Sequence, residues 1–322
     1  MTQLVMVTQR RRNGDDAAPW IVDGGRRTRG HDHDRRLTAL EEGLWRHARV
    51  SAIEADAADA EVERVLGALH DVTYLDALHD VFRSEREPAL MPAFTAPGLE
   101  PDIPVGAGLV AAAHEGVRTA ITAAQHVAAG ARFTYALCRP PGHHAGPAWL
   151  GGYCYLNTAA AATQTLLDAG AGPVGILDLD LHYPNGTSAI VAQMRDAELH
   201  SLHAWPVTNA PEDPVLPRTE REALIEFRTA PDATTYLEAV GASVAALARC
   251  ARVLVLSLGY DTVAGDPHGS WSFEPGIFAE IGRLLAASGL PICVIQEGGY
   301  ALETLADCSY AFATGLLEED AA

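Results

Sequence analysis

The sequence predicts an α/β fold, a single domain with a parallel β-sheet and helices on both faces of the sheet. From residue 110 onward, Ala-rich helical stretches alternate with short apolar runs. Strands separated by helices in this order pair in parallel, because each helix carries the chain back across the sheet. The 322 residues are 48% hydrophobic and 20% charged, which is enough apolar material for a large core.

The expected elements follow the chain in order. Residues 1–36 predict an irregular N-terminal segment, because Arg clusters are mixed there with Gly, Asp and His. Residues 37–98 predict short helices that end in a stretch broken by Pro88, Pro92 and Pro97. Helices are then expected over residues 110–129, 156–169, 185–195, 234–250, 277–288 and 302–317. Between them lie the expected strands, at 133–138, 174–179, 199–202, 253–258 and 292–296, so residues 37–322 are expected to form one α/β domain.

Composition excludes several classes of protein. The formal net charge is −19, and a strongly acidic surface repels nucleic acid. All 23 basic residues are Arg, so Schiff-base catalysis and a Walker phosphate loop, which both need Lys, are excluded. The five scattered cysteines predict neither a disulfide framework nor a cysteine zinc site. Without an apolar run of membrane-spanning length or a signal-peptide pattern, we expect a cytoplasmic protein with no membrane partner.

Polar residues follow each of the five expected strands. In an open parallel sheet, ligands bind beyond the carboxyl ends of the strands, so these segments are expected to meet at one crevice. The segments are residues 139–144 (RPPGHH), 178–182 (DLDLH), 201–203 (SLH), 259–261 (GYD) and 297–300 (EGGY).

One of these segments has the alternation of a metal site. Asp178, Asp180 and His182 stand at alternate positions after an apolar run, so in an extended chain they share one face. Carboxylate oxygens and an imidazole nitrogen suit zinc or iron(II). A strand end with two solvated carboxylates would give the same pattern, and this segment alone does not decide between the two interpretations.

Five motifs resemble, in order and spacing, those of the histone deacetylase and acetylpolyamine amidohydrolase superfamily. They are residues 139–146 (RPPGHHAG), 152–157 (GYCYLN), 178–187 (DLDLHYPNGT), 259–267 (GYDTVAGDP) and 297–300 (EGGY). Glu297 before the paired glycines is more similar to the acetylpolyamine and class II branch than to the class I enzymes. The resemblance implies an arginase/deacetylase-like fold and the hydrolysis of C–N bonds in linear amides.

The resemblance also implies a catalytic metal ion. By position, Asp180, His182 and Asp261 match the ligands of Zn²⁺, with Fe²⁺ as the alternative ion. Three protein ligands leave the metal open to water and to the substrate carbonyl, as hydrolysis requires. A K⁺ site is permitted at the matching positions Asp178, Asp180, His182, Ser201 and Leu202.

Proton transfer is assigned, by the same resemblance, to His143 and His144. Asp178 is expected to hydrogen-bond His143, and Asn185 stands at the position beside His144. A carboxylate raises the proton affinity of an imidazole and a neutral amide does not, so the two pKa values are expected to differ. His144 is the expected general base and then acid, and Tyr300 is the expected donor to the oxyanion.

Further residues are expected to contact the substrate. By resemblance Gly152 and Tyr153 line the tunnel to the metal, with the carbonyl of Gly152 accepting from the substrate. Gly299 is expected to let the backbone turn closely around the substrate, and His268 stands where the family tends to have an apolar rim residue. Trp205 either closes the pocket or packs in the protein, and the sequence leaves both open.

The sequence departs from the family pattern in two places. Tyr183-Pro184 replaces the usual His-Gly, and because proline fixes φ and lacks an N–H, the loop carrying Asn185 is a candidate for altered geometry. The loop after His203 also lacks the family's glycine-rich element. The rim of the pocket is therefore expected to differ, and histone specificity does not carry over.

These residues predict a metal-dependent amidohydrolase that removes an acetyl or other short acyl group from a small, polyamine-like amine. One alternative is a catalytically silent protein that binds acylated amines. Others are acyl transfer, cleavage of a different acyl bond in a biosynthetic pathway, or a two-metal ureohydrolase of the arginase type, although that last site needs more ligands than this chain offers. The expected partner is a small acylated amine, and the sequence leaves the oligomeric state open.

Overall fold

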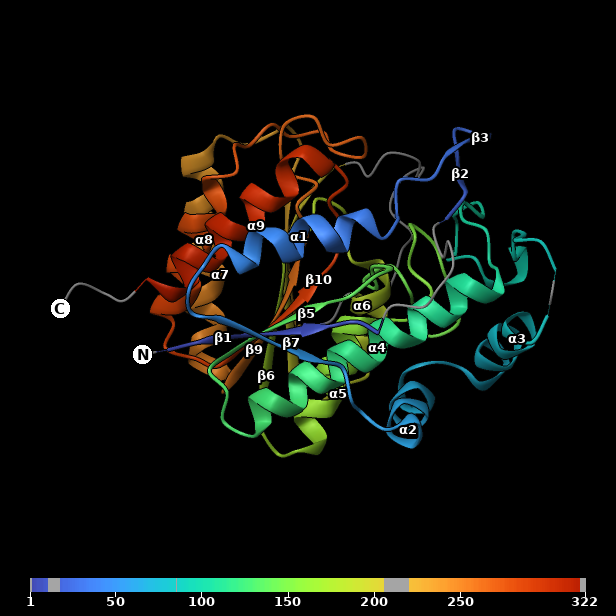
Figure 1. Cartoon of the computed structure of the whole chain (residues 1–322), viewed down its shortest axis with the longest axis horizontal. Coiled ribbons are helices and arrows are strands. Elements are labelled where there is room, and N and C mark those ends of the chain that lie inside the picture. Colours follow the sequence, from blue (N-terminus) through green and yellow to red (C-terminus); the bar gives the residue numbers. More distant parts are fainter. Residues whose placement is uncertain (1, 11–17, 85, 206–219, 319–322) are drawn as a thin grey trace.

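Eight parallel strands form the central sheet of the structure (Figure 1), a computed structural model that describes residues 2–10, 18–84, 86–205 and 220–318. Across the sheet the order is β4-β1-β5-β10-β9-β6-β7-β8. The strands are β1 (Leu4–Thr8), β4 (Val50–Glu54), β5 (Phe133–Leu137), β6 (Val174–Asp178), β7 (Ala197–Ala204), β8 (Glu222–Phe227), β9 (Val253–Leu258) and β10 (Ile292–Gln296). All residues of β5, β6, β9 and β10 are buried, as expected for a sheet covered on both faces.

Helices cover both faces of the sheet, which confirms the predicted fold class. One face packs against α1 (Arg35–Trp45), α7 (Ala233–Cys250), α8 (Ile277–Ala287) and α9 (Leu302–Leu317). The other packs against α2 (Asp59–Leu69), α3 (Val72–Phe82), α4 (Ala107–Ala128), α5 (Thr158–Asp168) and α6 (Asn185–Val191). Successive residues of a strand point into the hydrophobic cores on opposite faces of the sheet. In β5, Phe133 and Tyr135 face the α9 side, while Ala136 faces the α4 side. A short 3₁₀ helix, η1 (Pro92–Phe94), lies in the proline-broken stretch.

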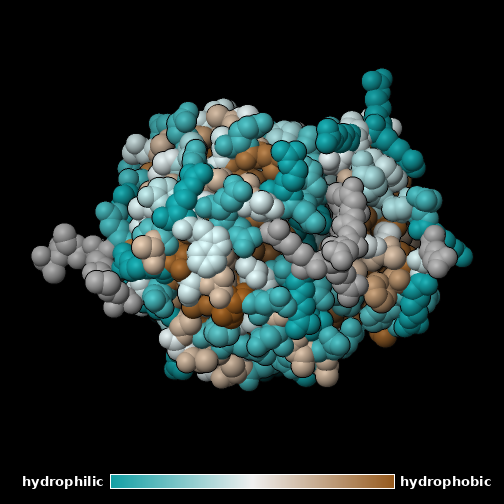
Figure 2. Space-filling view, in the orientation of Figure 1, coloured by the Kyte–Doolittle hydropathy of each residue, from teal (hydrophilic) through white to brown (hydrophobic). Residues whose placement is uncertain are grey.

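The expectation that residues 1–36 are irregular is wrong for three strands. β1 lies inside the sheet between β4 and β5, while β2 (Trp20–Asp23) and β3 (Arg26–Arg29) form an antiparallel hairpin. The hairpin stands out from the body as a hydrophilic projection, and all four residues of β3 are exposed (Figure 2). The apolar run of β1 is short and adjoins an Arg cluster, so the local sequence does not predict a strand there. Pairing with the neighbouring strands of the sheet stabilises it.

Two further strands were missed for a related reason. β4 and β8 are the edge strands of the sheet, and many of their residues are partly exposed. Edge strands mix polar and apolar residues, so they lack the uninterrupted apolar runs of the inner strands. In the part of the chain that the structure describes, no helix combines the length and hydrophobicity needed to cross a membrane.

Candidate active site

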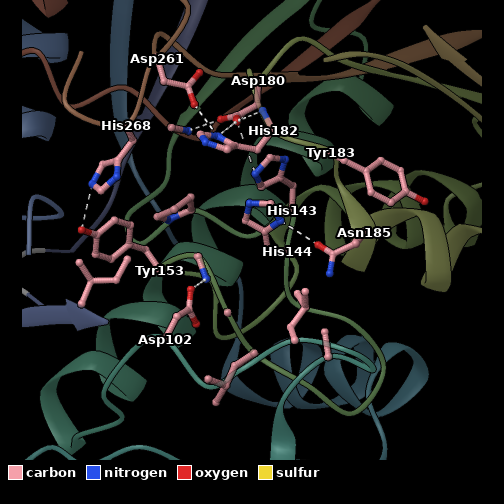
Figure 3. Close-up of a pocket in the computed structure, with 18 of the residues that line it drawn as sticks. Asp102, His143, His144, Tyr153, Asp180, His182, Tyr183, Asn185, Asp261 and His268 are labelled. Atoms are coloured by element: carbon pink, nitrogen blue, oxygen red, sulfur yellow. Dashed lines mark hydrogen bonds and ion pairs between the residues drawn. The ribbon is translucent and has the colours of Figure 1, made fainter. Parts of the chain in front are cut away.

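Three side chains at the carboxyl edge of the sheet bring ligand atoms within 4.8 Å of one another: Asp180, His182 and Asp261. The first two follow β6, and Asp261 follows the neighbouring strand β9. His182 Nδ1 lies 3.1 Å from Asp180 Oδ1 and 2.9 Å from Asp261 Oδ2 (Figure 3). Both carboxylates are buried. The three ligands expected from the sequence therefore converge on one point.

The chemistry of this cluster fits a divalent metal ion. Asp261 Oδ2 is buried and finds no hydrogen-bond donor of suitable geometry among the described residues, whereas Oδ1 accepts from the N–H of Leu181 at 3.0 Å. Burial and the nearby Asp180 raise the pKa of Asp261 to about 7, because two buried carboxylates repel each other. A cation between them removes this repulsion, and two carboxylates with one imidazole are ligands that Zn²⁺ and Fe²⁺ accept.

Glycines allow the backbone to pack against Asp180. The N–H of Gly298 donates to Asp180 Oδ2 at 2.8 Å, and a Cβ on Gly298 would lie 2.5 Å from the same oxygen. A Cβ on Gly259 would lie 2.4 Å from it. A side chain at either position would displace the carboxylate, which explains why the two motifs that flank the cluster carry glycine there.

His143 and His144 have different hydrogen-bond partners, as expected. His143 Nδ1 lies 3.3 Å from Asp178 Oδ2, and His144 Nδ1 lies 2.7 Å from Asn185 Oδ1. Burial lowers the pKa of His143, but the charges of Asp180 and Asp178 outweigh burial and raise this pKa to about 10. Burial, with the neighbouring His143, holds the pKa of His144 well below its usual value. The two imidazoles therefore differ in proton affinity in the predicted direction.

Tyr300 is held through both its ring and its backbone. The guanidinium carbon of Arg36 lies 4.4 Å from the centroid of the ring, and the N–H of Tyr300 donates to Asp266 Oδ2 at 2.6 Å. Arg36 is buried and donates to the carbonyls of Gly299 and Glu297, both at 2.6 Å. These contacts fix Tyr300 where it lines the pocket.

A pocket of about 210 Å³ extends from the ligand cluster to the surface. Gly152, Tyr153, Trp205 and His268 line it, as do His143, His144 and Tyr300. His268 Nε2 lies 3.2 Å from the hydroxyl of Tyr153, and burial lowers the pKa of His268 to about 4. Gly299 is not among the described lining residues, and its carbonyl accepts from Arg36 Nε at 2.6 Å; its expected contact with the substrate stays a prediction.

The turn at Gly152-Tyr153 lies directly against His144. Both turn residues have positive φ, +54° and +68°, and Tyr153 is the one non-glycine residue with positive φ in the described ranges. A Cβ on Gly152 would lie 2.3 Å from His144 Cδ2, so only glycine fits this approach. Asp102 Oδ2 accepts from the N–H of Gly152 at 2.8 Å and so holds the turn (Figure 3).

The Tyr183-Pro184 departure does not prevent the expected contact between Asn185 and His144. The hydroxyl of Tyr183 donates to Ser188 Oγ at 3.0 Å, and its ring lies 5.1 Å from that of His203. Asn185 still reaches His144, so the expected alteration of this contact is not seen.

The positions expected for potassium lie together at one edge of β6 and β7. Asp178 and Ser201 are direct partners across these parallel strands, and Leu202 follows Ser201. Asp180 and His182 belong to the ligand cluster described above. The K⁺ site stays a prediction.

Sequence reasoning missed several residues that support the site. Asp102 lies in a loop without any motif, and nothing in its local sequence signals a role. Arg36 and its partner Asp32, 2.6 Å away, lie near the boundary of the segment expected to be irregular. Asp266 falls inside the 259–267 motif, so its position was a usable signal. Glu297 Oε2 accepts from the N–H groups of Gly142 and His143 and thereby fixes the turn before the histidine pair.

The fold is that of an α/β protein with a parallel sheet, and the ligand cluster and the histidine pair lie together in its pocket. The chain belongs to the histone deacetylase family, whose model, described as the histone deacetylase domain, matches residues 31–316. The resemblance expected from the motifs is confirmed, and membership of this family supports a deacetylase or amidohydrolase activity.

Known relatives agree with this assignment. The chain is 34% identical over 273 residues to acetylpolyamine amidohydrolase 1 of Pseudomonas aeruginosa, covering 74% of this chain and 78% of the relative. It is 36% identical over 206 residues to acetylpolyamine amidohydrolase of Mycoplana ramosa, covering 62% and 60%. The crystal structure of acetylpolyamine aminohydrolase from Burkholderia pseudomallei matches with a TM-score of 0.81 at 27% identity, over 98% of this chain and 99% of that one.

Proposed function

We propose that this protein uses a divalent metal ion to hydrolyse an acetyl or other short acyl amide of a small, polyamine-like amine. The observation that carries the proposal is the convergence of five side chains on one pocket: the ligand set Asp180, His182 and Asp261, together with His144 and Tyr300. The names of the relatives, acetylpolyamine amidohydrolases, support the same substrate class.

Asp180, His182 and Asp261 would hold the ion, Zn²⁺ or Fe²⁺, which would polarise the acyl carbonyl and acidify a water molecule beside it. His144 accepts the proton of the attacking water. Its Nδ1–H donates to Asn185 Oδ1, an atom that can only accept, so Nε2 is the basic nitrogen. This bond also fixes the orientation of the imidazole.

Tyr300 donates its hydroxyl proton in a hydrogen bond to the oxygen that becomes negative as water adds to the carbonyl. His143, with its ring centroid 4.1 Å from that of His144 and its Nδ1 beside Asp178, keeps the two imidazoles in a fixed arrangement. When the C–N bond breaks, the proton taken by His144 passes to the leaving nitrogen. The products are a carboxylic acid and the free amine.

The pocket lining supports a slender cationic substrate. Glu100 and Asp102 line the pocket and supply negative charge for a distal ammonium group. The rings of Tyr153, His268 and Tyr300 lie 4.9 to 5.5 Å from one another and form an aromatic wall suited to an alkyl chain. Gly152 offers its carbonyl to the amide N–H, and Trp205 borders the same space.

A substrate panel tests this proposal. The purified protein is incubated with an N-acetylated polyamine, an acetyl-lysine peptide and longer acyl amides of the same polyamine, and kcat/KM is measured by amine release. We expect the acetylpolyamine to give the highest kcat/KM, with Tyr300→Phe as the control that assigns turnover to this site. A clear preference for the peptide would overturn the substrate class, and no turnover of any amide would overturn the activity.

A further inference from the structure

A second group of metal-ligand side chains lies on three helices outside the pocket. Glu63 on α2, His79 on α3 and His114 on α4 each bring a ligand atom within 4.8 Å of the others. None of the three is among the described residues that line the active-site pocket. In Figure 1 these helices pack beside one another at one end of the molecule, on the α4 face of the sheet.

The distances within this group are close to those of a coordinated ion. Glu63 Oε2 lies 3.7 Å from His79 Nε2, and Glu63 Oε1 lies 3.9 Å from His114 Nδ1. Ligands about 2.0–2.2 Å from a tetrahedral ion lie roughly 3.3–3.6 Å from one another, so each of the two Glu63–histidine pairs needs to close by only a few tenths of an ångström. The ligand nitrogens of the two histidines lie within 4.8 Å of each other. The two imidazole rings are stacked, with centroids 5.6 Å apart and an interplanar angle of 29°.

Exposure gives the side chains the freedom for this adjustment. The side chains of Glu63, His79 and His114 are 51%, 28% and 18% exposed, so an ion can enter from solvent and retain water at a fourth position. The backbone positions are fixed by packing: Val62, Val65 and Leu66 of α2 and Leu78 of α3 are buried in the core beneath.

We propose that Glu63, His79 and His114 form a second metal site, which binds a zinc-class divalent transition-metal ion and ties α2 and α3 to α4. Two imidazoles and one carboxylate select Zn²⁺ or its neighbours in the first transition row, and not Ca²⁺ or Mg²⁺, which prefer oxygen ligands alone. The site rests on none of the residues of the proposed catalytic centre.

The helices that carry this site also contact the loop that follows the histidine pair. At the corner between α2 and α3, the N–H of Asp71 donates to the carbonyl of Pro147 at 2.7 Å, and His70 Nδ1 lies 2.8 Å from the carbonyl of Gly146. This corner therefore already holds the loop that follows the histidine pair. An ion shared by α2, α3 and α4 would stabilise the same helices, and its binding energy would add to the folding energy of the protein.

Zinc stoichiometry tests the proposal. The full-length protein, His79→Gln/His114→Gln and His126→Gln are titrated with Zn²⁺ in competition with a chromogenic chelator. His126 lies on α4 like His114, is partly exposed and belongs to neither ligand cluster, so its variant is the matched control. We expect the wild type and His126→Gln to bind one Zn²⁺ per chain more than the double variant. An excess of Mg²⁺ is expected to leave this difference unchanged.

Thermal unfolding gives an independent readout. At a free Zn²⁺ concentration about 100 times Kd, the ion is expected to raise the Tm of the wild type by roughly 4 °C more than that of Glu63→Gln, a substitution at an exposed side chain. Equal zinc content in wild type and double variant would overturn the proposal and leave the cluster as surface ion pairs only. If the proposed catalytic site binds no ion, the number of Zn²⁺ ions per chain falls equally in all three proteins and the difference between them remains. Failure of the proposed function is therefore distinguishable from failure of this second site.

Discussion

Asn185 Oδ1 accepts a hydrogen bond from His144 Nδ1 over 2.7 Å, and this bond decides which nitrogen of the imidazole is basic. The contact forms although Pro184 precedes Asn185. Pro184 is the N-cap residue of α6, where a backbone N–H has no partner within the helix, so the proline costs no hydrogen bond. The chain therefore combines an unusual loop sequence with the geometry expected of a general base.

Because of this hydrogen bond, we expect two substitutions of Asn185 to have different effects. Asn185→Leu removes the acceptor that orients His144, and we expect kcat/KM to fall about tenfold, the equivalent of one hydrogen bond of about 1.4 kcal/mol. Asn185→Asp places a carboxylate there and raises the pKa of His144, so the acidic limb of the kcat/KM profile moves to higher pH. A pH–rate profile of both variants checks this, and superimposable limbs for wild type and Asn185→Asp would contradict the assignment of His144 as base.

Tyr300→Phe tests the role of the hydroxyl separately from the packing of the ring. The phenylalanine ring retains its contact with the guanidinium of Arg36, which lies 4.4 Å from the ring centroid, so Tm is expected to change little. Loss of the oxyanion donor is expected to lower kcat by about 10²- to 10³-fold. Kinetics and thermal unfolding of the same preparation test both parts. A folded variant with wild-type kcat would remove Tyr300 from the mechanism.

Asp102 predicts a pH-dependent KM for cationic substrates. Burial raises the pKa of Asp102 to about 6, so the carboxylate loses its charge as the pH falls through 6. We expect KM for an acetylpolyamine to rise by about 5- to 10-fold between pH 7.5 and pH 5, while KM for an uncharged N-acetyl alkylamine stays level. Asp102→Asn keeps an acceptor for the N–H of Gly152 and is expected to remove the difference between the two substrates. The same pH dependence in wild type and variant would count against this role.

His70 predicts a loss of stability in acid. Burial lowers the pKa of this histidine to about 4, while its Nδ1 contacts the Gly146 carbonyl and its Nε2 accepts from the N–H of Asn157. Below about pH 6.5 this histidine binds a proton in the unfolded chain, whereas in the folded chain it stays neutral down to about pH 4. The free energy of unfolding is therefore highest above pH 6.5 and falls as the pH is lowered toward 4. By pH 5 about 2 kcal/mol is lost. Urea unfolding at pH 7.5 and pH 5 is expected to show this extra loss in wild type relative to His70→Gln, and equal losses would disprove it.

The sequence predicted the inner part of the sheet well, because buried parallel strands are short and uniformly apolar. The structure has β9 and β10 with the expected bounds. The edge strands β4 and β8 and the N-terminal β1 were missed, since partial exposure or a neighbouring Arg cluster breaks the apolar pattern while pairing across the sheet compensates. Strand identity at those positions is decided by tertiary contacts.

The candidate site divides along similar lines. The ligand set and the histidine pair were predictable because they stand in ordered motifs directly after strands. Asp102 and Arg36 were not predictable, because each acts through contacts that are distant in sequence: Arg36 donates to the carbonyl of Glu297, 261 positions away. Asp102 likewise acts on Gly152, 50 positions away. Nothing in a local sequence window encodes such contacts.

Metal reconstitution tests the central claim most directly. The protein is stripped with a chelator, and kcat/KM for an acetylated polyamine is measured as Zn²⁺ or Fe²⁺ is returned, beside the His79→Gln/His114→Gln variant, which lacks the second proposed site. We expect activity to be lost on stripping and to return in both proteins as one ion binds the Asp180, His182 and Asp261 cluster. Full turnover by the stripped protein, or none after an ion has bound this cluster, would contradict the account.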